Sequence, residues 1–374
     1  MRVHVALSIL LLASCDADSL QQDDSAPFAL QDVLGGADAA GFLRADAPRA
    51  FSFPEDHGPH PGFRNEWWYF TGNVETAEGR RFGYQVTFFN AALRSSAFAD
   101  ASAGQVAEAS SWQTQHVWMA HLAVSDIENA EHHAFERFSR ESPGLAGATS
   151  TPLHVWLDDW QLTTQSESEW RLQAAEAGIA LDLNLASVKA PVLQGVDGLS
   201  QKGREAGNAS YYYSVTRIAT DGMLRIGDEA FTVSGSSWLD REWSTSALDD
   251  DQSGWDWFSL QFDDGQELMY YQLRTETGVA HPNSQGNWTD TAARQTLLTP
   301  DTVTLTELDT WTSPSGIAYT TAWSLAYAGR TWRVEALFDE QWMNLTIPYW
   351  EGAVDVRDEN GERIGRGYLE MVRN

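Results

Sequence analysis

The sequence contains a single cysteine, Cys15, among its 374 residues. One cysteine cannot form an internal disulfide, so the folded chain must be held together by its hydrophobic cores alone. Basic residues are also scarce, with 24 Lys and Arg against 53 Asp and Glu, and the formal net charge is −29. Since a phosphate backbone is bound through Lys and Arg, we expect no nucleic acid among the partners.

Apart from the apolar run near the N-terminus, the chain has no long hydrophobic runs. No other stretch approaches the roughly 18 apolar residues of a membrane-spanning helix. Residues 1–15 read MRVHVALSILLLASC, with a basic Arg2, an apolar run and then Leu12-Ala13-Ser14-Cys15. This order is typical of a secretory signal peptide. Its last four residues resemble the bacterial lipobox, in which the cysteine is lipidated and becomes the mature N-terminus. The alternative is an ordinary signal peptide that contains a cysteine.

We therefore expect a lipoprotein signal peptide over residues 1–14 and a lipid on Cys15. The protein would be anchored in the bacterial cell envelope, facing the periplasm or the exterior. Residues 15–48 are polar and acidic, which favours a tether between the membrane and the folded part.

Helical periodicity is scarce, whereas aromatic residues are abundant, with 17 Trp in the chain. Strand-forming segments recur about every 8–12 residues, separated by turn signals such as Asp263-Asp264-Gly265 and Asn360-Gly361. This pattern predicts an all-β protein of antiparallel sandwiches or barrels. The length suits two domains of about 100–200 residues each. We place them at 49–236 and 237–374.

Two motifs that would indicate common enzyme classes are absent. The chain has no Gly-x-Ser-x-Gly nucleophile elbow, so a serine hydrolase finds no support. His57 and His60, with Asp56 and Glu66 nearby, are metal ligands by type, but they lie in a proline-rich loop. No second cluster supplies a third ligand at a recognisable spacing. We expect a loop anchored by hydrogen bonds, and neither a metal nor another cofactor.

The stretch from Gly235 to Met269 combines four tryptophans with several acids. On a strand, Trp238, Asp240 and Glu242 share one face, while Leu239, Arg241 and Trp243 share the other. An ionised carboxylate costs several kcal/mol to bury unless it is paired. Either basic residues neutralise these acids structurally, or one acid works inside a pocket.

Six motifs rich in aromatic and acidic residues follow one another along the chain: Asp56-His57-Gly58 with His60 and Phe63, Glu66-Trp67-Trp68-Tyr69-Phe70-Thr71-Gly72, Ser210-Tyr211-Tyr212-Tyr213-Ser214, Trp238-Leu239-Asp240-Arg241-Glu242-Trp243, Gly254-Trp255-Asp256-Trp257-Phe258 and Tyr349-Trp350-Glu351-Gly352-Ala353. They resemble the AttH-like family of secreted proteins. That family belongs with hydroxyneurosporene synthase, a carotenoid 1,2-hydratase (CrtC), in one lipocalin-like superfamily. The similarity covers roughly Phe51 to Val372, and it implies two packed lipocalin-like antiparallel β-barrel domains.

The resemblance also implies a site. Trp238 and Asp240 match the aromatic-x-Asp pair of the carotenoid hydratase branch. Its upstream His-x-Trp pair falls near Tyr211 and Tyr213, so the histidine is absent, which argues against hydration of a carotenoid itself. The expected walls of a ligand cavity are Trp68, Tyr211, Tyr213, Trp238, Glu242 and Trp257.

Burial in such a cavity would raise the pKa of Asp240 and keep it protonated. The acid could then protonate an isoprenoid double bond, and aromatic faces would stabilise the resulting cation. The alternative is that Asp240 pairs with an arginine from elsewhere in the chain. His116 shares a strand face with Trp118 and is a second candidate proton carrier, with packing as the alternative.

Three functions remain open at this point. The first is a membrane-anchored carrier of a hydrophobic, lipid- or isoprenoid-like small molecule, with a transport system as a further partner. The second is a carotenoid 1,2-hydratase-like hydro-lyase that uses Asp240 as general acid. The third is a structural module whose aromatic interiors are only cores. The family's label of secreted hydrolase rests on the resemblance alone.

Overall fold

The computed structural model describes residues 39–95, 115–245, 249 and 251–373. The predicted signal peptide, Cys15 and most of the predicted tether lie outside the described residues. Within these residues the fold is built from strands, and η1 (Glu55–His57) is a short 3-10 helix. The all-β prediction is confirmed. The described part contains no helix long and apolar enough to span a membrane.

The first sheet has thirteen strands in the order β4-β3-β2-β1-β13-β12-β9-β8-β7-β6-β5, with β10 and β11 also paired to β12. It curls, so that β6 near one end lies against β2, β3 and β4 near the other. Its strands are β1 (Asn65–Glu75), β2 (Arg81–Ala92), β3 (His116–Asp126), β4 (Glu131–Arg140), β5 (Ala146–Ser150), β6 (Leu153–Leu157), β7 (Trp160–Ser166), β8 (Glu169–Glu176), β9 (Ile179–Ser187), β10 (Val192–Leu193), β11 (Leu199–Gln201), β12 (Ala209–Ile226) and β13 (Glu229–Ser244).

The second sheet has ten strands in the order β17-β16-β15-β14-β23-β22-β20-β19-β18, with β21 also paired to β22. Both sheets are antiparallel, as the turn signals predict. The strands are β14 (Gln252–Phe262), β15 (Glu267–Thr275), β16 (Gln285–Thr289), β17 (Gln295–Leu298), β18 (Val303–Thr312), β19 (Ala318–Tyr327), β20 (Arg330–Ala336), β21 (Trp342–Met343), β22 (Tyr349–Arg357) and β23 (Arg363–Arg373).

The change from one sheet to the other lies between Ser244 and Gln252. The boundary placed at 236/237 falls inside β13, whose Ser236 and Ser237 both pair with β1 and with β12. No proline- or glycine-rich linker marks the change in sequence, because one strand runs almost directly into the next. The first unit therefore includes the whole of β13.

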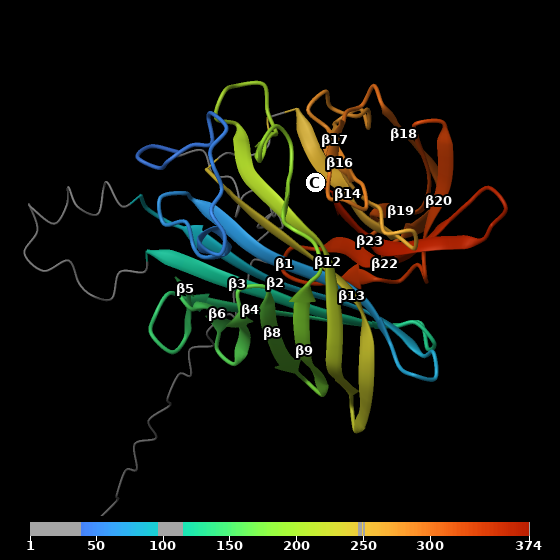
Figure 1. The fold of residues 1–374 in the computed structure, drawn as a ribbon, viewed down its shortest axis with the longest axis horizontal. Coiled ribbons are helices and arrows are strands. Elements are labelled where there is room, and N and C mark those ends of the chain that lie inside the picture. Colours follow the sequence, from blue (N-terminus) through green and yellow to red (C-terminus); the bar gives the residue numbers. More distant parts are fainter. Residues whose placement is uncertain (1–38, 96–114, 246–248, 250, 374) are drawn as a thin grey trace, which may run out of the picture.

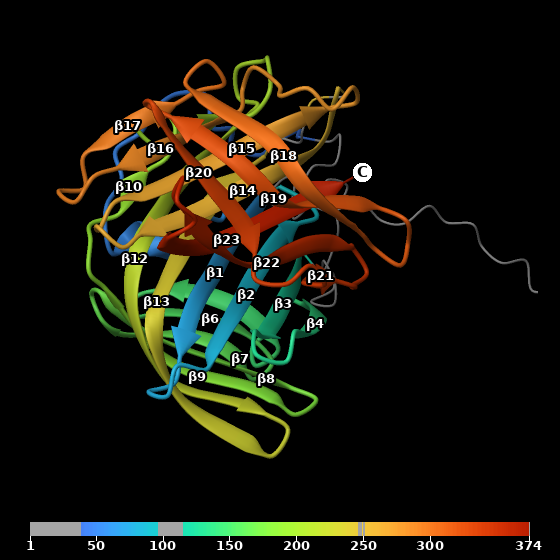
Figure 2. The same ribbon diagram turned by 90° about the vertical axis from the view of Figure 1, so that its right-hand side faces the viewer.

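Each sheet encloses its own hydrophobic core, and a third layer lies between the two sheets. Figure 1 shows the second sheet, in orange and red, lying across one face of β1, β2, β12 and β13. Contacts of β23 with β1, β22 with β2 and β14 with β12 join the sheets, and Figure 2 shows β22 above β2 from the side. The central strands of the first sheet are thus covered on both faces.

Candidate functional site

Asp240 lies on β13, on the face that meets the second sheet, and is only 3% exposed. Its carboxylate accepts three hydrogen bonds. Tyr212 donates to Oδ2, while Ser214 Oγ and Trp238 Nε1 donate to Oδ1 at 2.5 and 2.6 Å. Trp238 reaches it because residues two apart on a strand share a face. No Lys or Arg among the described residues forms an ion pair with Asp240.

Burial raises the pKa of Asp240 from 3.8 to about 7, and the nearby charge of Glu242 adds to the rise. The three hydrogen bonds act in the opposite direction, because all of them favour the ionised form. A carboxyl with a pKa near neutral can both give and take a proton at physiological pH. This is the property required of a general acid or base.

Residues of the second sheet complete the surroundings of Asp240. Trp257 Nε1, on β14, donates to the hydroxyl of Tyr212 at 3.1 Å and so extends the hydrogen-bond chain across the interface. The ring of Trp257 lies edge-on to Trp238 and to Tyr69, with centroids 6.4 and 5.2 Å apart. Aromatic faces and edges therefore surround the acid.

Glu351 and Glu370 face the same layer from the second sheet. They lie directly opposite each other on β22 and β23. Tyr69 donates to Glu351 Oε1 at 2.5 Å, and Trp255 Nε1 donates to Glu370 Oε1 at 2.5 Å. Burial and the charges of Asp240 and Glu242 raise the pKa of Glu370 to about 7. Asp240 and Glu370, whose pKa values are both about 7, thus face the same layer from the two sheets.

The layer is not closed everywhere. Trp67 on β1, Trp255 on β14 and Glu370 on β23 are partly exposed, whereas Asp240 and Trp238 beside them are buried. Trp67 and Trp255 also pack against both hydrophobic clusters that lie between the sheets. Solvent therefore reaches the edge of the layer at these three residues.

The structure separates the residues proposed as cavity walls into two groups. Trp238, Glu242 and Trp257 lie with Asp240 between the sheets, whereas Trp68, Tyr211 and Tyr213 belong to the core inside the first sheet. Tyr211 and Tyr213 are opposite Trp243 and Arg241, whose side chains point inward. The tyrosine that binds Asp240 is instead Tyr212, which lies between Tyr211 and Tyr213 on β12 and faces the second sheet.

Arg241 does not neutralise Asp240, as the strand alternation predicts. Its side chain is fully buried on the inner face and pairs with Glu66 at 3.0 Å, while it also donates to the carbonyls of Gly58 and Trp67. Although burial alone would disfavour the charge of Glu66, hydrogen bonding to His60 and the Arg241 guanidinium hold the pKa of Glu66 at about 2. This pair is structural.

Glu242 is on the same face of β13 as Asp240, but it forms an ion pair with a lysine. Lys202 Nζ lies 3.1 Å from Glu242 Oε1, which also accepts a hydrogen bond from Ser210. The ammonium group lies over the rings of Tyr271 and Tyr212 at 3.8 and 5.2 Å. Of Asp240, Glu242 and Glu370, Glu242 is therefore the one that has a cationic partner among the described residues.

Two histidines of β3 lie on opposite faces of the strand, and the predicted proton carrier, His116, is on the face away from the second sheet. His116 is hydrogen-bonded to Asn90 at 2.9 Å and lies away from Asp240, so it does not belong to this site. His121, on the other face of β3, lies between the sheets with its Nδ1 2.8 Å from the Tyr349 hydroxyl. Burial lowers the pKa of His121 to about 3, which keeps it neutral.

The proline-rich loop is anchored by hydrogen bonds. His57 Nδ1 lies 2.6 Å from the Tyr213 hydroxyl, and the His60 ring stacks on Trp243 with centroids 3.6 Å apart. Asp56 binds both Arg49 and His60. These contacts use the polar atoms that a metal ion would need.

Asp249, Asp251 and His281 bring possible ligand atoms within 4.8 Å of one another. His281 Nδ1, however, accepts from the backbone N–H of Asn283 and faces the amide nitrogen of Gln252, both at 3.2 Å. A neutral imidazole then carries its proton on Nε2, the atom that would have to coordinate. The donor set does not fit a metal ion.

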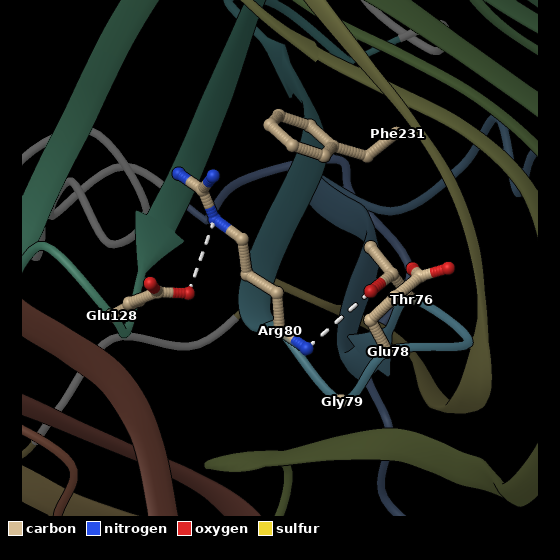
Figure 3. A pocket seen from close by; sticks show the side chains of 6 residues that line it. All are labelled: Thr76, Glu78, Gly79, Arg80, Glu128 and Phe231. Carbon is tan, nitrogen blue, oxygen red and sulfur yellow. Dashed lines mark hydrogen bonds and ion pairs between the residues drawn. The ribbon is translucent and has the colours of Figure 1, made fainter.

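A surface hollow of about 370 Å³ lies far from Asp240, at the turn between β1 and β2. In Figure 3, Arg80 points toward Glu128 while its backbone N–H bonds to Thr76. The residues that line it are Thr76, Glu78, Gly79, Arg80, Glu128 and Phe231. None of them belongs to the predicted site.

Comparisons with known proteins agree on one family. Residues 44–373 match the family described as AttH-like. A crystal structure of a protein assigned as AttH from Nitrosomonas europaea is 32% identical, with a TM-score of 0.77, and the match covers 87% of this chain and 99% of that one. No curated protein matches this sequence.

Two further crystal structures share the fold at low identity. Kievitone hydratase from Nectria haematococca is 15% identical with a TM-score of 0.66, covering 89% of this chain and 96% of its own. CghA, solved with Sch210972, is 13% identical with a TM-score of 0.51, covering 91% and 97%. Both matches span nearly the whole of each chain, so the two-sheet architecture is common to all of them.

Proposed function

The chain belongs to the AttH-like family, and we propose that it transfers a proton to a hydrophobic, unsaturated small molecule bound between its two sheets, in a reaction of hydro-lyase type. The observation that carries the proposal is Asp240, a buried carboxyl without a cation partner and with a pKa of about 7. Buried titratable groups with strongly shifted pKa values are enriched at functional sites.

The surroundings of Asp240 suit an isoprenoid-like alkene. Protonation of a trisubstituted double bond leaves a tertiary cation, and the rings of Trp238, Trp257 and Tyr69 lie around the acid. Each aromatic face can stabilise a nearby cation by about 0.5–2 kcal/mol. Addition of water to the cation then gives an alcohol. Tyr212 would remain hydrogen-bonded to the Asp240 carboxylate that is left behind.

Kievitone hydratase carries hydration in its name on a similar fold. At 15% identity that likeness concerns the fold, so the proposal for this chain rests on Asp240 and not on the name. A carotenoid is not the expected substrate, because Tyr211 and Tyr213 stand where the hydratase branch has its His-x-Trp pair. A shorter isoprenoid is the better probe.

The test is a reaction with farnesol in D₂O, followed by mass spectrometry. The wild-type protein should place deuterium on a former alkene carbon and add a hydroxyl group. Asp240→Asn should lower deuterium uptake at least about 100-fold, the usual contribution of general acid catalysis. The matched control is Asp228→Asn, an exposed acid in the turn between β12 and β13, which should react as the wild type does.

Two outcomes would contradict the proposal. Deuterium uptake that survives in Asp240→Asn would show that another group supplies the proton. Farnesol that is bound by all three proteins and recovered without deuterium would favour the carrier role instead. In that case the polar chain from Asp240 to Trp257 would only hold the sheets together.

We also propose that Cys15 carries a lipid and anchors the protein in the cell envelope, which the Leu12-Ala13-Ser14-Cys15 sequence supports. Delivery of the bound molecule to a transport system stays a prediction. In a bacterial host, Cys15→Ser should move the protein from the membrane fraction to the soluble fraction and abolish labelling by an alkynyl fatty acid. Equal labelling of the variant and the wild type would contradict the anchor.

A further inference from the structure

The carboxyl pair on the second sheet has no role in the proton transfer described so far. Glu351 and Glu370 are cross-strand partners on β22 and β23, and Glu351 is only 1% exposed. Like charges directly opposite each other on two strands repel. Two such carboxylates in a buried layer would be strongly destabilising unless a cation or a proton reduces their charge.

No cation does so within the described residues, where neither Glu351 nor Glu370 forms an ion pair with Lys, Arg or His. The partners are neutral donors, namely the Tyr69 hydroxyl for Glu351 and the Trp255 indole for Glu370. The second oxygen of Glu351, Oε2, is buried and makes no close hydrogen bond in the described part of the chain, and the Tyr349 hydroxyl nearby is another neutral donor. The pair must therefore retain at least one proton.

The position of each carboxyl indicates which one keeps the proton. Glu351 lies deep in the layer, whereas Glu370 is partly exposed at the opening beside Trp255 and Trp67. Desolvation favours the neutral acid most at the deeper position. The pKa values agree, because burial and the charge of Glu370 raise the pKa of Glu351 well above the 4.5 of a free Glu.

The groups that face Glu370 are known from each neighbouring strand. They are Tyr69 on β1, Tyr349 and Glu351 on β22, Trp255 and Trp257 on β14, and Asp240 and Glu242 on β13, with Lys202 beside Glu242. Trp257 is the cross-strand partner of Glu370 and also donates to Tyr212, which binds Asp240. Asp240 and Glu370 thus lie on opposite walls of the layer, linked by Trp257 and Tyr212.

We propose that Glu370 is the general base that takes a proton from the attacking water, and that Glu351 is a positioning residue that holds the shared proton of the pair. This inference rests on the proposed function. Asp240 and Glu370 would act on the two sides of one double bond, much as an acid carboxyl and a base carboxyl flank the cleaved bond in inverting glycosidases.

The proposed reaction balances as follows in atoms and charge. The Asp240 carboxylic acid gives its proton to one alkene carbon, a C–H bond forms, and the π bond breaks to leave a carbocation. A water oxygen bonds to that carbocation, and one water proton passes to the Glu370 carboxylate. The product is a neutral alcohol. Loss of the proton from Glu370 and its return to Asp240, through solvent at the opening, restores the starting state.

The two carboxyls can be separated by isotopes, since each acts on a different atom. With farnesol in D₂O enriched in ¹⁸O, deuterium uptake into recovered alkene reports protonation by Asp240, and ¹⁸O in the alcohol reports addition of water. Glu370→Gln should keep deuterium uptake within about threefold of wild type but lose at least about 100-fold in ¹⁸O incorporation. Asp240→Asn should lose both. The matched control is Glu359→Gln, exposed in the turn between β22 and β23.

An infrared titration of the full chain without ligand gives a second, independent readout. The wild type should show carboxylic acid absorption from both Asp240 and Glu370 that disappears near neutral pH, and Glu370→Gln should lose only the Glu370 part of it. In Asp240→Asn the remaining Glu370 band should titrate at lower pH, because a neighbouring negative charge has been removed. Near-UV circular dichroism would confirm that each variant is folded.

Several results would overturn the inference. These are ¹⁸O incorporation that survives in Glu370→Gln, equal loss of both isotopes in Glu370→Gln, and loss of ¹⁸O in Glu351→Gln with retention in Glu370→Gln. An infrared titration that is the same in Glu370→Gln and wild type would also overturn it. Absence of deuterium uptake by the wild type would instead overturn the proposed function, which distinguishes the two failures.

Discussion

Asp240 and Arg241 are neighbours in sequence, yet their side chains lie in separate layers of the molecule. Successive residues of a strand face opposite sides, so Arg241 enters the core of the first sheet and Asp240 the layer between the sheets. Arg241 finds Glu66 there, and Asp240 finds only neutral donors. This difference leaves Asp240 near its point of half-ionisation and keeps Glu66 charged.

The pKa of Asp240 predicts how stability changes with pH. Between the free value of 3.8 and about 7, the folded protein keeps a proton that the unfolded chain has lost. The free energy of unfolding must therefore fall as pH rises through this window, by at most about 1.4 kcal/mol per pH unit for this group. Below the window both states are protonated, and above it the loss is complete.

Asp240→Asn should remove this dependence. Urea unfolding of the wild type and the variant at several pH values between about 4 and 8 measures the difference between them. We expect the wild type to lose stability relative to Asp240→Asn as pH rises. A constant difference across the window would show that Asp240 is not protonated in the folded protein.

Replacement of Arg241 should lower the free energy of unfolding substantially. Arg241→Met removes the partner of Glu66, whose side chain is 3% exposed, and should cost about 3–5 kcal/mol in the free energy of unfolding. Arg225→Met, at an exposed position of β12, should stay within about 0.5 kcal/mol of wild type. Urea unfolding at neutral pH compares the two. Equal, small losses in both variants would mean that the buried pair contributes little.

At the scale of the strand, β1, β12 and β13 meet in a fixed register that forms the site. Tyr69, Asp240 and Ser214 are aligned across the three strands, and so are Trp67, Glu242 and Tyr212. A shift of one residue would turn every side chain to the other face. The proposed chemistry therefore depends on the pairing of strands that are far apart in sequence.

Gly83 on β2 shows how closely the two sheets approach. A Cβ atom at this position would lie 2.8 Å from both the Ala353 Cβ and the Tyr368 hydroxyl, which belong to the second sheet. Gly83→Val should thus force the sheets apart locally and cost about 1–3 kcal/mol, measured by urea unfolding. Ser234→Val, at an exposed position of β13, is the control. Wild-type stability of Gly83→Val would contradict such tight packing.

The strands explain how far the sequence could predict this site. Alternation correctly places Trp238, Asp240 and Glu242 on one face. It could not choose between Tyr212 and its neighbours, because every residue from Ala209 to Thr216 is buried. A strand covered on both faces carries no alternation between apolar and polar residues. The register that brings Tyr212 to this face, and the approach of Glu370 from β23, depend on contacts distant in sequence.

The same reasoning applies to the domain boundary. Turn signals and strand composition predicted an all-β antiparallel chain, the length predicted two units, and the structure has two antiparallel sheets. The exact boundary was missed because β13 continues through Ser236 to Ser244 with the composition of the strands around it. Sequence therefore indicates the number of units better than the residue at which one ends.

At the scale of the whole molecule, polar contacts as well as hydrophobic ones join the two sheets. Glu267 on β15 has a fully buried side chain that pairs with Lys189 at 2.6 Å and with Arg217 at 2.7 Å, both from the first unit. Tyr69 with Glu351, and Trp257 with Tyr212, cross the same interface. We expect the two sheets to unfold together.

Glu267→Gln should weaken this connection, because both cations lose a charged partner in a buried place. The expected loss is about 3–5 kcal/mol. In scanning calorimetry the wild type should give one transition and the variant two. Glu276→Gln, exposed after β15, should leave the single transition unchanged. One transition at the wild-type temperature in Glu267→Gln would contradict a joint unfolding that depends on this contact.

The most direct test of where the protein acts uses two adjacent tyrosines on opposite faces of β12. Tyr212 donates to Asp240 between the sheets, whereas Tyr213 lies 2.6 Å from His57 in the core of the first sheet. Deuterium uptake by farnesol should fall at least about tenfold in Tyr212→Phe and stay near wild type in Tyr213→Phe. Loss of uptake in Tyr213→Phe with retention in Tyr212→Phe would place the site inside the first sheet and contradict this account.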